Sequence, residues 1–106
     1  MKRSVTVMTL GLMLLASPAW ADEKQIEIKD YQYGPANLTI PTGTKVTWIN
    51  RDEVPHTVTE PNKAFGSGAL DTDENFSTTF NEPGTYKYYC KLHPNMTGTI
   101  TVTPAK

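Results

Sequence analysis

Glu82–Met96 reads EPGTYKYYCKLHPNM, a turn followed by a strand-like alternation and then a run rich in sulfur and imidazole side chains. The Pro-Gly pair near its start is typical of a turn. After this pair, Tyr86, Tyr88 and Cys90 recur at every second position, so they fall on one face of an extended chain. The segment therefore predicts a half-buried β-strand whose last inward-facing residue is Cys90.

The same two-residue period recurs in four other segments. They are Gln25–Lys29, Lys45–Asn50, Asn75–Phe80 and Gly98–Thr103. Turn-forming residues separate the segments, at Gly34-Pro35, Pro41–Thr44 and Glu82–Gly84. Five or more short strands, with no amphipathic helical pattern beside them, predict a small all-β sandwich or barrel. In the long connection Asn62–Asp73 there is room for a helical turn.

The first 21 residues have the three parts of a secretory signal peptide. Lys2-Arg3 is positively charged, Ser4–Ala21 is uncharged, and Ala19-Trp20-Ala21 presents the small residues that a signal peptidase recognises. The alternative is a retained membrane anchor, because about 18 apolar residues can span a bilayer, but Pro18 sits where a spanning helix should continue. We therefore predict a signal peptide over residues 1–21, a periplasmic location without membrane insertion, and a single mature domain over residues 22–106.

Length and charge exclude several function classes. With 106 residues, the chain has room for one domain at most, which is too little for a multidomain enzyme. Removing Lys2 and Arg3 with the signal peptide leaves eight basic and eleven acidic side chains, a net charge of −3. Because no basic run remains, we do not expect nucleic-acid binding.

The mature domain contains only four residues with soft or imidazole ligand atoms. Cys90, His93 and Met96 are separated by two residues each, and His56 lies 34 residues before Cys90. A single Cys forms no internal disulfide, so its thiol in an exported domain calls for another explanation. Since Pro94-Asn95 favours a folded-back loop, we expect the three side chains to converge. His56 joins them if its segment closes the same end of the sandwich.

This set of ligand types indicates copper. Two imidazoles and a thiolate in a trigonal plane, with a weak axial thioether, form the typical copper site for electron transfer. Thiolate and thioether favour Cu(I), and imidazole also suits Cu(II). Zinc is the main competitor, but structural zinc sites use Cys and His only, and a catalytic zinc site would leave Met96 without a role.

Each residue also has a simpler interpretation. Cys90 alone would be a buried apolar residue, His56 a loop residue and Met96 a core residue. An enzyme would instead use Cys90 as nucleophile and His93 or His56 as base, but no residue in the sequence is nominated as an orienting third group. We therefore do not expect an enzyme.

Three segments resemble the blue copper proteins, or cupredoxins, and among them most closely the amicyanins. The segments are Val46–Arg51 running on to Pro55-His56, Phe80–Tyr86 leading into Tyr89-Cys90, and the short loop ending at Met96. The resemblance implies a Greek-key β-sandwich with one copper ion at one end, bound by His56, Cys90, His93 and Met96. It also implies a monomer that passes one electron at a time from an exported dehydrogenase, such as methylamine dehydrogenase, to a c-type cytochrome.

The sequence departs from that pattern at three points. The mature chain lacks the N-terminal extension of the amicyanins, and Thr57 replaces an Asn that ties the two ligand segments together. We expect the Thr57 hydroxyl to do part of that work. Leu92 replaces a Pro, so we expect its N–H to donate to the Cys90 sulfur. An apolar patch around His93 is also implied, including Val54, Pro55, Pro94 and Pro35.

Two other function classes stay open on the sequence alone. One is a copper-binding or copper-delivery protein without an electron-relay role. The other is a metal-free exported binding module. Only the first keeps the same four ligands, so the behaviour of the protein with copper separates all three.

Overall fold

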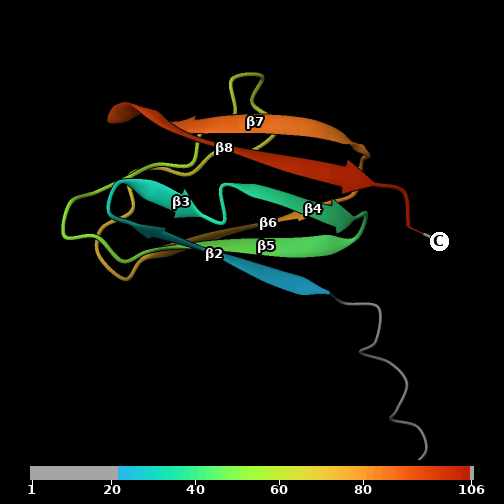
Figure 1. Cartoon of the computed structure of the whole chain (residues 1–106), viewed down its shortest axis with the longest axis horizontal. Helices are drawn as coiled ribbons and strands as arrows, with labels where there is room; N and C mark the ends of the chain where they lie inside the picture. The colour runs from blue at the N-terminus through green and yellow to red at the C-terminus, as the bar shows by residue number, and fades with distance from the viewer. Residues whose placement is uncertain (1–21, 106) are drawn as a thin grey trace, which may run out of the picture.

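The computed structural model describes residues 22–105, which form two β-sheets packed face to face (Figure 1). Its strands are β2 (Glu23–Lys29), β3 (Gln32–Gly34), β4 (Asn37–Pro41), β5 (Thr44–Asn50), β6 (Asn75–Phe80), β7 (Gly84–Cys90) and β8 (His93–Thr103). No helix occurs between residues 22 and 105. The predicted all-β sandwich is thus confirmed, whereas the predicted signal peptide lies outside the described residues.

The two sheets are joined by repeated crossings of the chain. One sheet has the strand order β3-β2-β5-β6 and the other the order β4-β8-β7. β2 pairs in parallel with β5, and β4 pairs in parallel with β8, while the remaining neighbours are antiparallel. Parallel neighbours need a crossover connection, so the chain passes from sheet to sheet between these strands. Among the described residues, no helix is long and apolar enough to cross a membrane.

The core lies between the sheets and is dominated by aromatic and β-branched side chains. Trp48 is fully buried and packs against Phe65, Phe76, Phe80 and Tyr88 at centroid distances between 5.4 and 6.5 Å. Burying each large apolar side chain contributes roughly 1.5–3 kcal/mol. Inward-facing residues of the predicted strands, including Ile26, Ile28, Val46, Ile100 and Val102, complete this core.

Three details of the fold differ from the sequence-based expectation. β3 and β4 were not predicted: β3 has only three residues, and the short alternation of Leu38 and Ile40 in β4 was missed. The connection from residue 62 to residue 73 contains turns and isolated bridges but no helical turn. The chain reverses at Lys91-Leu92, not at Pro94-Asn95, and β8 already begins at His93.

One end of the sandwich brings distant segments together. There the β7–β8 hairpin turns, and the connection between β5 and β6 runs alongside it (Figure 1). Thr59 and Tyr89 exchange two backbone hydrogen bonds of 2.9 Å, and His56 exchanges bonds of 3.2 and 2.7 Å with Leu70. These bridges fix the segment that carries His56 against the strand that ends in Cys90.

Candidate metal centre

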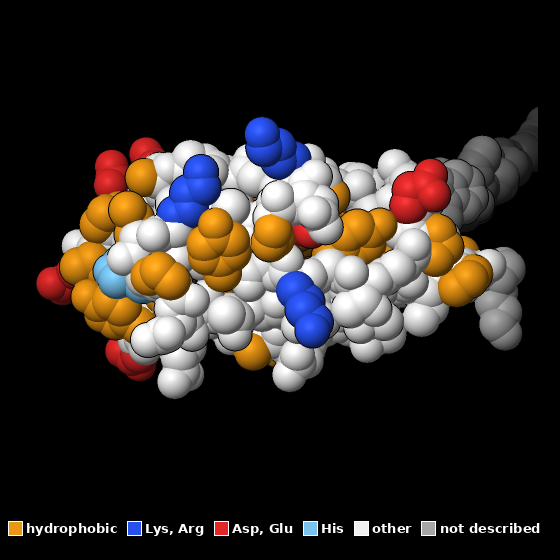
Figure 2. Space-filling model, turned by 90° about the horizontal axis from the view of Figure 1, so that it is seen from above, with side chains coloured by type: hydrophobic (Ala, Val, Ile, Leu, Met, Phe, Trp, Pro, Cys, Tyr) orange, Lys and Arg blue, Asp and Glu red, His pale blue; other side chains and the backbone are white. Residues whose placement is uncertain are grey.

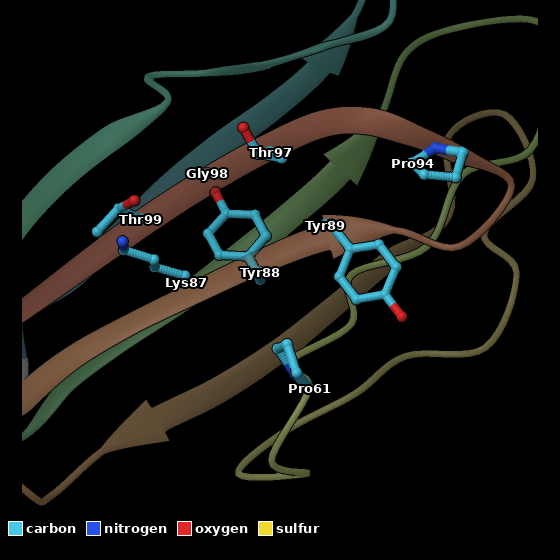
Figure 3. A pocket seen from close by; sticks show the side chains of 8 residues that line it. All are labelled: Pro61, Lys87, Tyr88, Tyr89, Pro94, Thr97, Gly98 and Thr99. Atoms are coloured by element: carbon cyan, nitrogen blue, oxygen red, sulfur yellow. The ribbon is translucent and has the colours of Figure 1, made fainter.

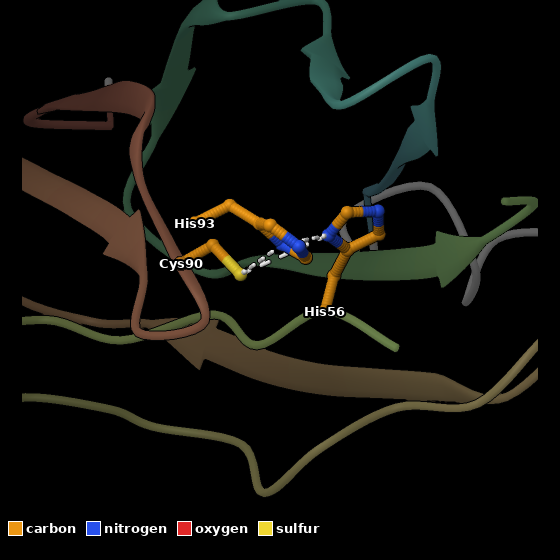
Figure 4. Close-up of side chains that lie close together, drawn as sticks. All are labelled: His56, Cys90 and His93. Carbon is orange, nitrogen blue, oxygen red and sulfur yellow. Dashed lines mark hydrogen bonds between the residues drawn. The ribbon is translucent and has the colours of Figure 1, made fainter. Parts of the chain in front are cut away.

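His56, Cys90 and His93 form a compact group of potential metal ligands (Figure 4). The Nδ1 atoms of the two histidines are 3.2 Å apart, and the Cys90 Sγ lies 3.8 Å from His56 Nδ1 and 3.6 Å from His93 Nδ1. All three side chains point toward one common space in Figure 4. Spacing in the sequence predicts that Cys90 and His93 converge, and His56 joins them because its segment lies at the same end of the sandwich.

The size of this triangle matches that of a metal ion. A point equidistant from three corners with these separations lies about 2.1 Å from each donor atom. Metal–nitrogen distances in protein zinc sites are about 2.0–2.1 Å, and metal–sulfur distances are about 2.3 Å. Two imidazoles and a thiol at these positions therefore fit a soft or borderline metal such as copper.

The backbone places each of the three donors. Cys90 ends β7 and His93 begins β8, and the two are opposite each other in the hairpin register. His56 comes from the β5–β6 connection and forms a bridge with Leu70. Cys90 and His56 are fully buried, whereas His93 is partly exposed. A ligand ring that reaches the surface offers a short route between a buried metal and a partner.

Asp52 orients the His56 ring from the side opposite the other ligands. Its Oδ2 lies 2.8 Å from His56 Nε2, so the opposite ring nitrogen, Nδ1, faces the other ligands. Asp52 is buried and also accepts hydrogen bonds from the backbone N–H groups of Asp30 and Tyr31. Burial raises the pKa of the Asp52 carboxyl, but the Tyr31 and Asp30 amides and His56 outweigh it and hold that pKa below its usual value. A carboxylate of this kind fixes the tautomer and the direction of a metal-binding imidazole.

Thr57 connects the two ligand-bearing segments. Its N–H donates a 3.3 Å hydrogen bond to the Cys90 sulfur, and its hydroxyl accepts a 2.9 Å hydrogen bond from the Lys91 N–H. The expected role of the Thr57 hydroxyl is therefore confirmed. The expectation that Leu92 supplies the hydrogen bond to sulfur is wrong: the Thr57 amide donates to Cys90 Sγ, and Leu92 lies in the exposed turn.

Met96 lies close to this group on β8. Its side chain is 5% exposed, and it lines a hollow of about 440 Å³ together with His93 and Tyr31. The same face of the molecule carries the two exposed large hydrophobic side chains of the described chain, Tyr31 and Leu92. Figure 2 shows apolar side chains gathered around a histidine at this end of the molecule.

The predicted apolar patch is only partly matched by this hollow. Pro94 lines it, whereas Val54 lines the neighbouring hollow on the other side of Tyr31. Pro35 and Pro55 line neither of the two. Sequence reasoning missed Tyr31 and Asp52. For Asp52, a usable signal was its position four residues before His56, whereas Tyr31 lies between a predicted strand and a predicted turn and had no clear signal.

A second hollow, of about 490 Å³, lies on the outer face of the β7–β8 sheet (Figure 3). It is lined by Pro61, Lys87, Tyr88, Tyr89, Pro94, Thr97, Gly98 and Thr99. This set contains no imidazole, thiol or thioether, so it offers a metal ion none of the donors found at the hairpin end. The candidate metal ligands therefore lie around Cys90 and not in this hollow.

Comparison with known proteins identifies related chains. The family model for a cupredoxin-like domain matches residues 4–102. Amicyanin of Paracoccus denitrificans is 37% identical over 82 residues, which cover 73% of this chain and 63% of that protein. Amicyanin of Paracoccus versutus is 33% identical over 87 residues, covering 77% of this chain and 66% of that protein. The chain thus spans slightly less than two thirds of these two relatives.

Solved structures show the same similarity. A purple cupredoxin from Nitrosopumilus maritimus superposes with a TM-score of 0.71 at 41% identity, covering 76% of this chain and 99% of that one. An amicyanin variant in its Cu(I) form superposes with a TM-score of 0.72 at 31% identity, covering 78% of this chain and 82% of that one. Both similarities extend over most of the described sandwich.

Proposed function

This chain belongs to the cupredoxin family, and from that premise we propose that it is a type 1, or blue, copper protein that carries one electron at a time. The observation that carries the proposal is the triangle of two Nδ1 atoms and one Sγ atom at the closed end of the sandwich. It contains the donor types that copper electron-transfer sites use. The role is a carrier and not an enzyme.

We assign the ligand roles by donor type. His56, Cys90 and His93 are the three strong ligands, and Met96 is the weak axial one. When bound, the copper ion supplies the redox chemistry, because it takes up one electron as Cu(II) and releases it as Cu(I). The protein contributes a thiolate and a thioether that favour the reduced ion and two imidazoles that suit both states.

The surrounding residues keep this ligand set still. Asp52 holds the His56 ring, Thr57 holds the Lys91 amide, and the hairpin register holds Cys90 opposite His93. Ligands locked by hydrogen bonds and packing change position little when the charge of a bound metal changes. Small rearrangement favours rapid electron transfer, as a carrier requires.

The proposal also includes a cellular location and redox partners. The signal-like sequence before residue 22 favours a periplasmic protein. The carrier role favours a monomer. Tyr31, Leu92 and Pro94 around the partly exposed His93 give a small apolar surface, which suits brief docking of a redox partner. By similarity to the amicyanins, the donor is methylamine dehydrogenase and the acceptor is a c-type cytochrome.

Adding Cu(II) to the purified metal-free protein tests the function. We expect one copper ion per chain, an intense visible absorption from thiolate-to-copper charge transfer, and reversible bleaching by a reductant. Cys90→Ser should abolish the colour. A colourless complex of the wild-type protein with copper would overturn the electron-carrier proposal and favour copper binding or delivery, and a chain that retains no copper would favour a metal-free binding module.

The partner assignment is tested separately. Reduced methylamine dehydrogenase is mixed with the Cu(II) protein, and the visible band should bleach at a rate that saturates with the dehydrogenase concentration. Bleaching by a chemical reductant but not by this dehydrogenase would leave the carrier role intact and exclude this donor.

A further inference from the structure

The turn between β2 and β3 has an unusual backbone conformation. Asp30 and Tyr31 form a two-residue hairpin loop between the paired residues Lys29 and Gln32, and their φ angles are +54° and +60°. Two-residue hairpins of this kind normally use Asn and Gly at these positions, because most side chains are strained at positive φ. A Tyr held there indicates that its side chain is needed where the turn places it.

This turn places the Tyr31 ring against both histidines of the metal centre. The ring centroid lies 4.7 Å from that of His93 and 5.3 Å from that of His56, with the planes nearly perpendicular. His56 has no exposed surface, whereas Tyr31 is 49% exposed. The Tyr31 ring therefore stands at the boundary between solvent and the two imidazoles.

Asp52 fixes the turn and the ligand together. Its Oδ2 accepts a 2.9 Å hydrogen bond from the Tyr31 N–H and lies 2.8 Å from His56 Nε2. Its Oδ1 accepts a 2.7 Å hydrogen bond from the Asp30 N–H. One buried carboxylate thus compensates the strained turn and sets the distance between Tyr31 and the His56 ring.

We propose that Tyr31 is a fixed cover over the metal centre, which restricts the access of water, small anions and soluble reagents to the ligand set. Asp52 is the positioning residue of this cover. The proposal rests on the metal site assigned above, since exclusion of extra ligands keeps the coordination of a redox metal constant. Access to Cys90 is its measurable consequence, because that thiol is fully buried beside both histidines.

Alkylation of Cys90 by iodoacetamide in the metal-free protein tests the cover without copper. The chain has a single Cys, so every alkylated product reports this position. Loss of two edge-to-face ring contacts in Tyr31→Ala should speed alkylation by about tenfold. Tyr31→Gly should show the same increase and also suits the positive φ, which guards against misfolding. Tyr31→Phe, which keeps the ring, should retain the wild-type rate.

Leu92→Ala is the matched control. Leu92 is 50% exposed and lines the same hollow, but the ring contacts with the two histidines come from Tyr31. Its alkylation rate should equal that of the wild type. Unchanged rates in Tyr31→Ala and Tyr31→Gly, or an equal increase in Leu92→Ala, would overturn the cover. Urea unfolding of each variant separates local access from global loss of stability.

Azide binding to the copper-loaded protein gives a second readout. The visible spectrum of the wild type should be insensitive to azide, and that of Tyr31→Ala should change with saturable dependence on azide. Equal azide sensitivity in the two proteins would overturn the cover. Failure of the wild type to form a coloured copper complex would overturn the metal assignment instead, while the alkylation result would still decide the role of Tyr31.

Discussion

Thr57 and Cys90, 33 residues apart in the chain, are joined by a 3.3 Å hydrogen bond from the Thr57 N–H to the Cys90 sulfur. Hydrogen bonds to the sulfur of a copper-bound Cys tune the reduction potential, since they draw charge from the thiolate. The same residue holds the next peptide, because its hydroxyl accepts the Lys91 N–H at 2.9 Å. Thr57 therefore sets both the electronic environment of the sulfur and the position of the hairpin turn.

Replacing the Thr57 hydroxyl should destabilise the hairpin end. Thr57→Val keeps the shape of the side chain but leaves the Lys91 N–H without its acceptor. We expect the free energy of unfolding to fall by about 1 kcal/mol, as for a lost hydrogen bond in a buried setting. Urea denaturation of the metal-free protein measures this change.

Thr59→Val is the matched control for this variant. Among residues 22–105, the Thr59 hydroxyl bonds only to that of Thr57, so its loss leaves the bond from Lys91 intact. We expect a smaller loss of stability than in Thr57→Val. Equal losses in the two variants would show that the Lys91 anchor contributes nothing of its own.

Asp52→Asn should weaken metal binding through the orientation of His56. An amide has a single acceptor oxygen, whereas the Asp52 carboxylate serves the N–H groups of Asp30 and Tyr31 and the His56 ring. Loss of such a supporting carboxylate typically lowers metal affinity about 10- to 100-fold. Competition with a chelator measures the copper affinity of each protein.

Asp73→Asn is the control for a simple loss of negative charge. Asp73 pairs with Arg51 on the surface, at 2.7 Å, and does not contact the ligand group. Its copper affinity should match that of the wild type. If the two variants lose copper affinity by the same amount, Asp52 acts only through net charge.

The sequence predicted those parts of the fold that depend on local pattern. β2, β5, β6 and β7 were placed within two residues of their ends, since their side chains alternate between core and solvent. β4 also alternates, with Leu38 and Ile40 on one face, so a local signal for this strand was present and was missed. The predicted strand begins at Gly98, five residues after the start of β8, because the residue types of His93–Met96 are those of ligands and turns.

At the site, the sequence predicted the donors but not the residues that position them. Spacing predicted that Cys90 and His93 would lie together, and the structure also brings His56 to them, which the sequence left conditional on the fold. Their supports depend on tertiary structure: Asp52 reaches across to the β2–β3 turn, and Thr57 reaches across to β7. The hydrogen bond expected from Leu92 is not formed, and the donor to the sulfur is instead the amide of Thr57, which lies 33 residues away in the chain.

Met96→Leu should keep the colour of the copper protein and raise its reduction potential. Met96 is buried, and Leu has a similar volume, so the ligand plane should survive the change. Without the thioether the oxidised ion loses a donor, which favours Cu(I). We expect an upward shift of tens of millivolts, where about 59 mV is a tenfold change for one electron. Cyclic voltammetry measures it, and a lower potential would contradict the axial role.

Gly98→Ala should destabilise the β7–β8 sheet. Figure 3 shows the Tyr88 ring beside Gly98, and a Cβ at this position would collide with that ring. Overpacking of this kind typically costs about 1–3 kcal/mol. Gly68→Ala is the control, since its Cβ would meet no atom within 4 Å. Thermal unfolding should separate the two variants, and equal stability would show that the ring moves aside freely.

Tyr88→Phe should make the protein less sensitive to alkali. The Tyr88 hydroxyl is buried without a hydrogen-bond partner among the described residues, and burial raises its pKa to about 12, with the nearby Trp48 opposing the shift. In the unfolded chain the pKa of Tyr is about 10. Between these two values only the unfolded state loses this proton, so the wild type loses stability as the pH rises through this window.

The size of the effect follows from the two pKa values. The wild type should lose on the order of 2 kcal/mol more than Tyr88→Phe between about pH 10 and pH 12. At neutral pH the variant should be at least as stable, since it removes an unpaired buried hydroxyl. Urea unfolding across this pH range measures both. Tyr86→Phe, which removes a hydroxyl at the surface, should follow the wild-type profile. Parallel profiles for the wild type and Tyr88→Phe would mean that this phenol stays accessible to solvent.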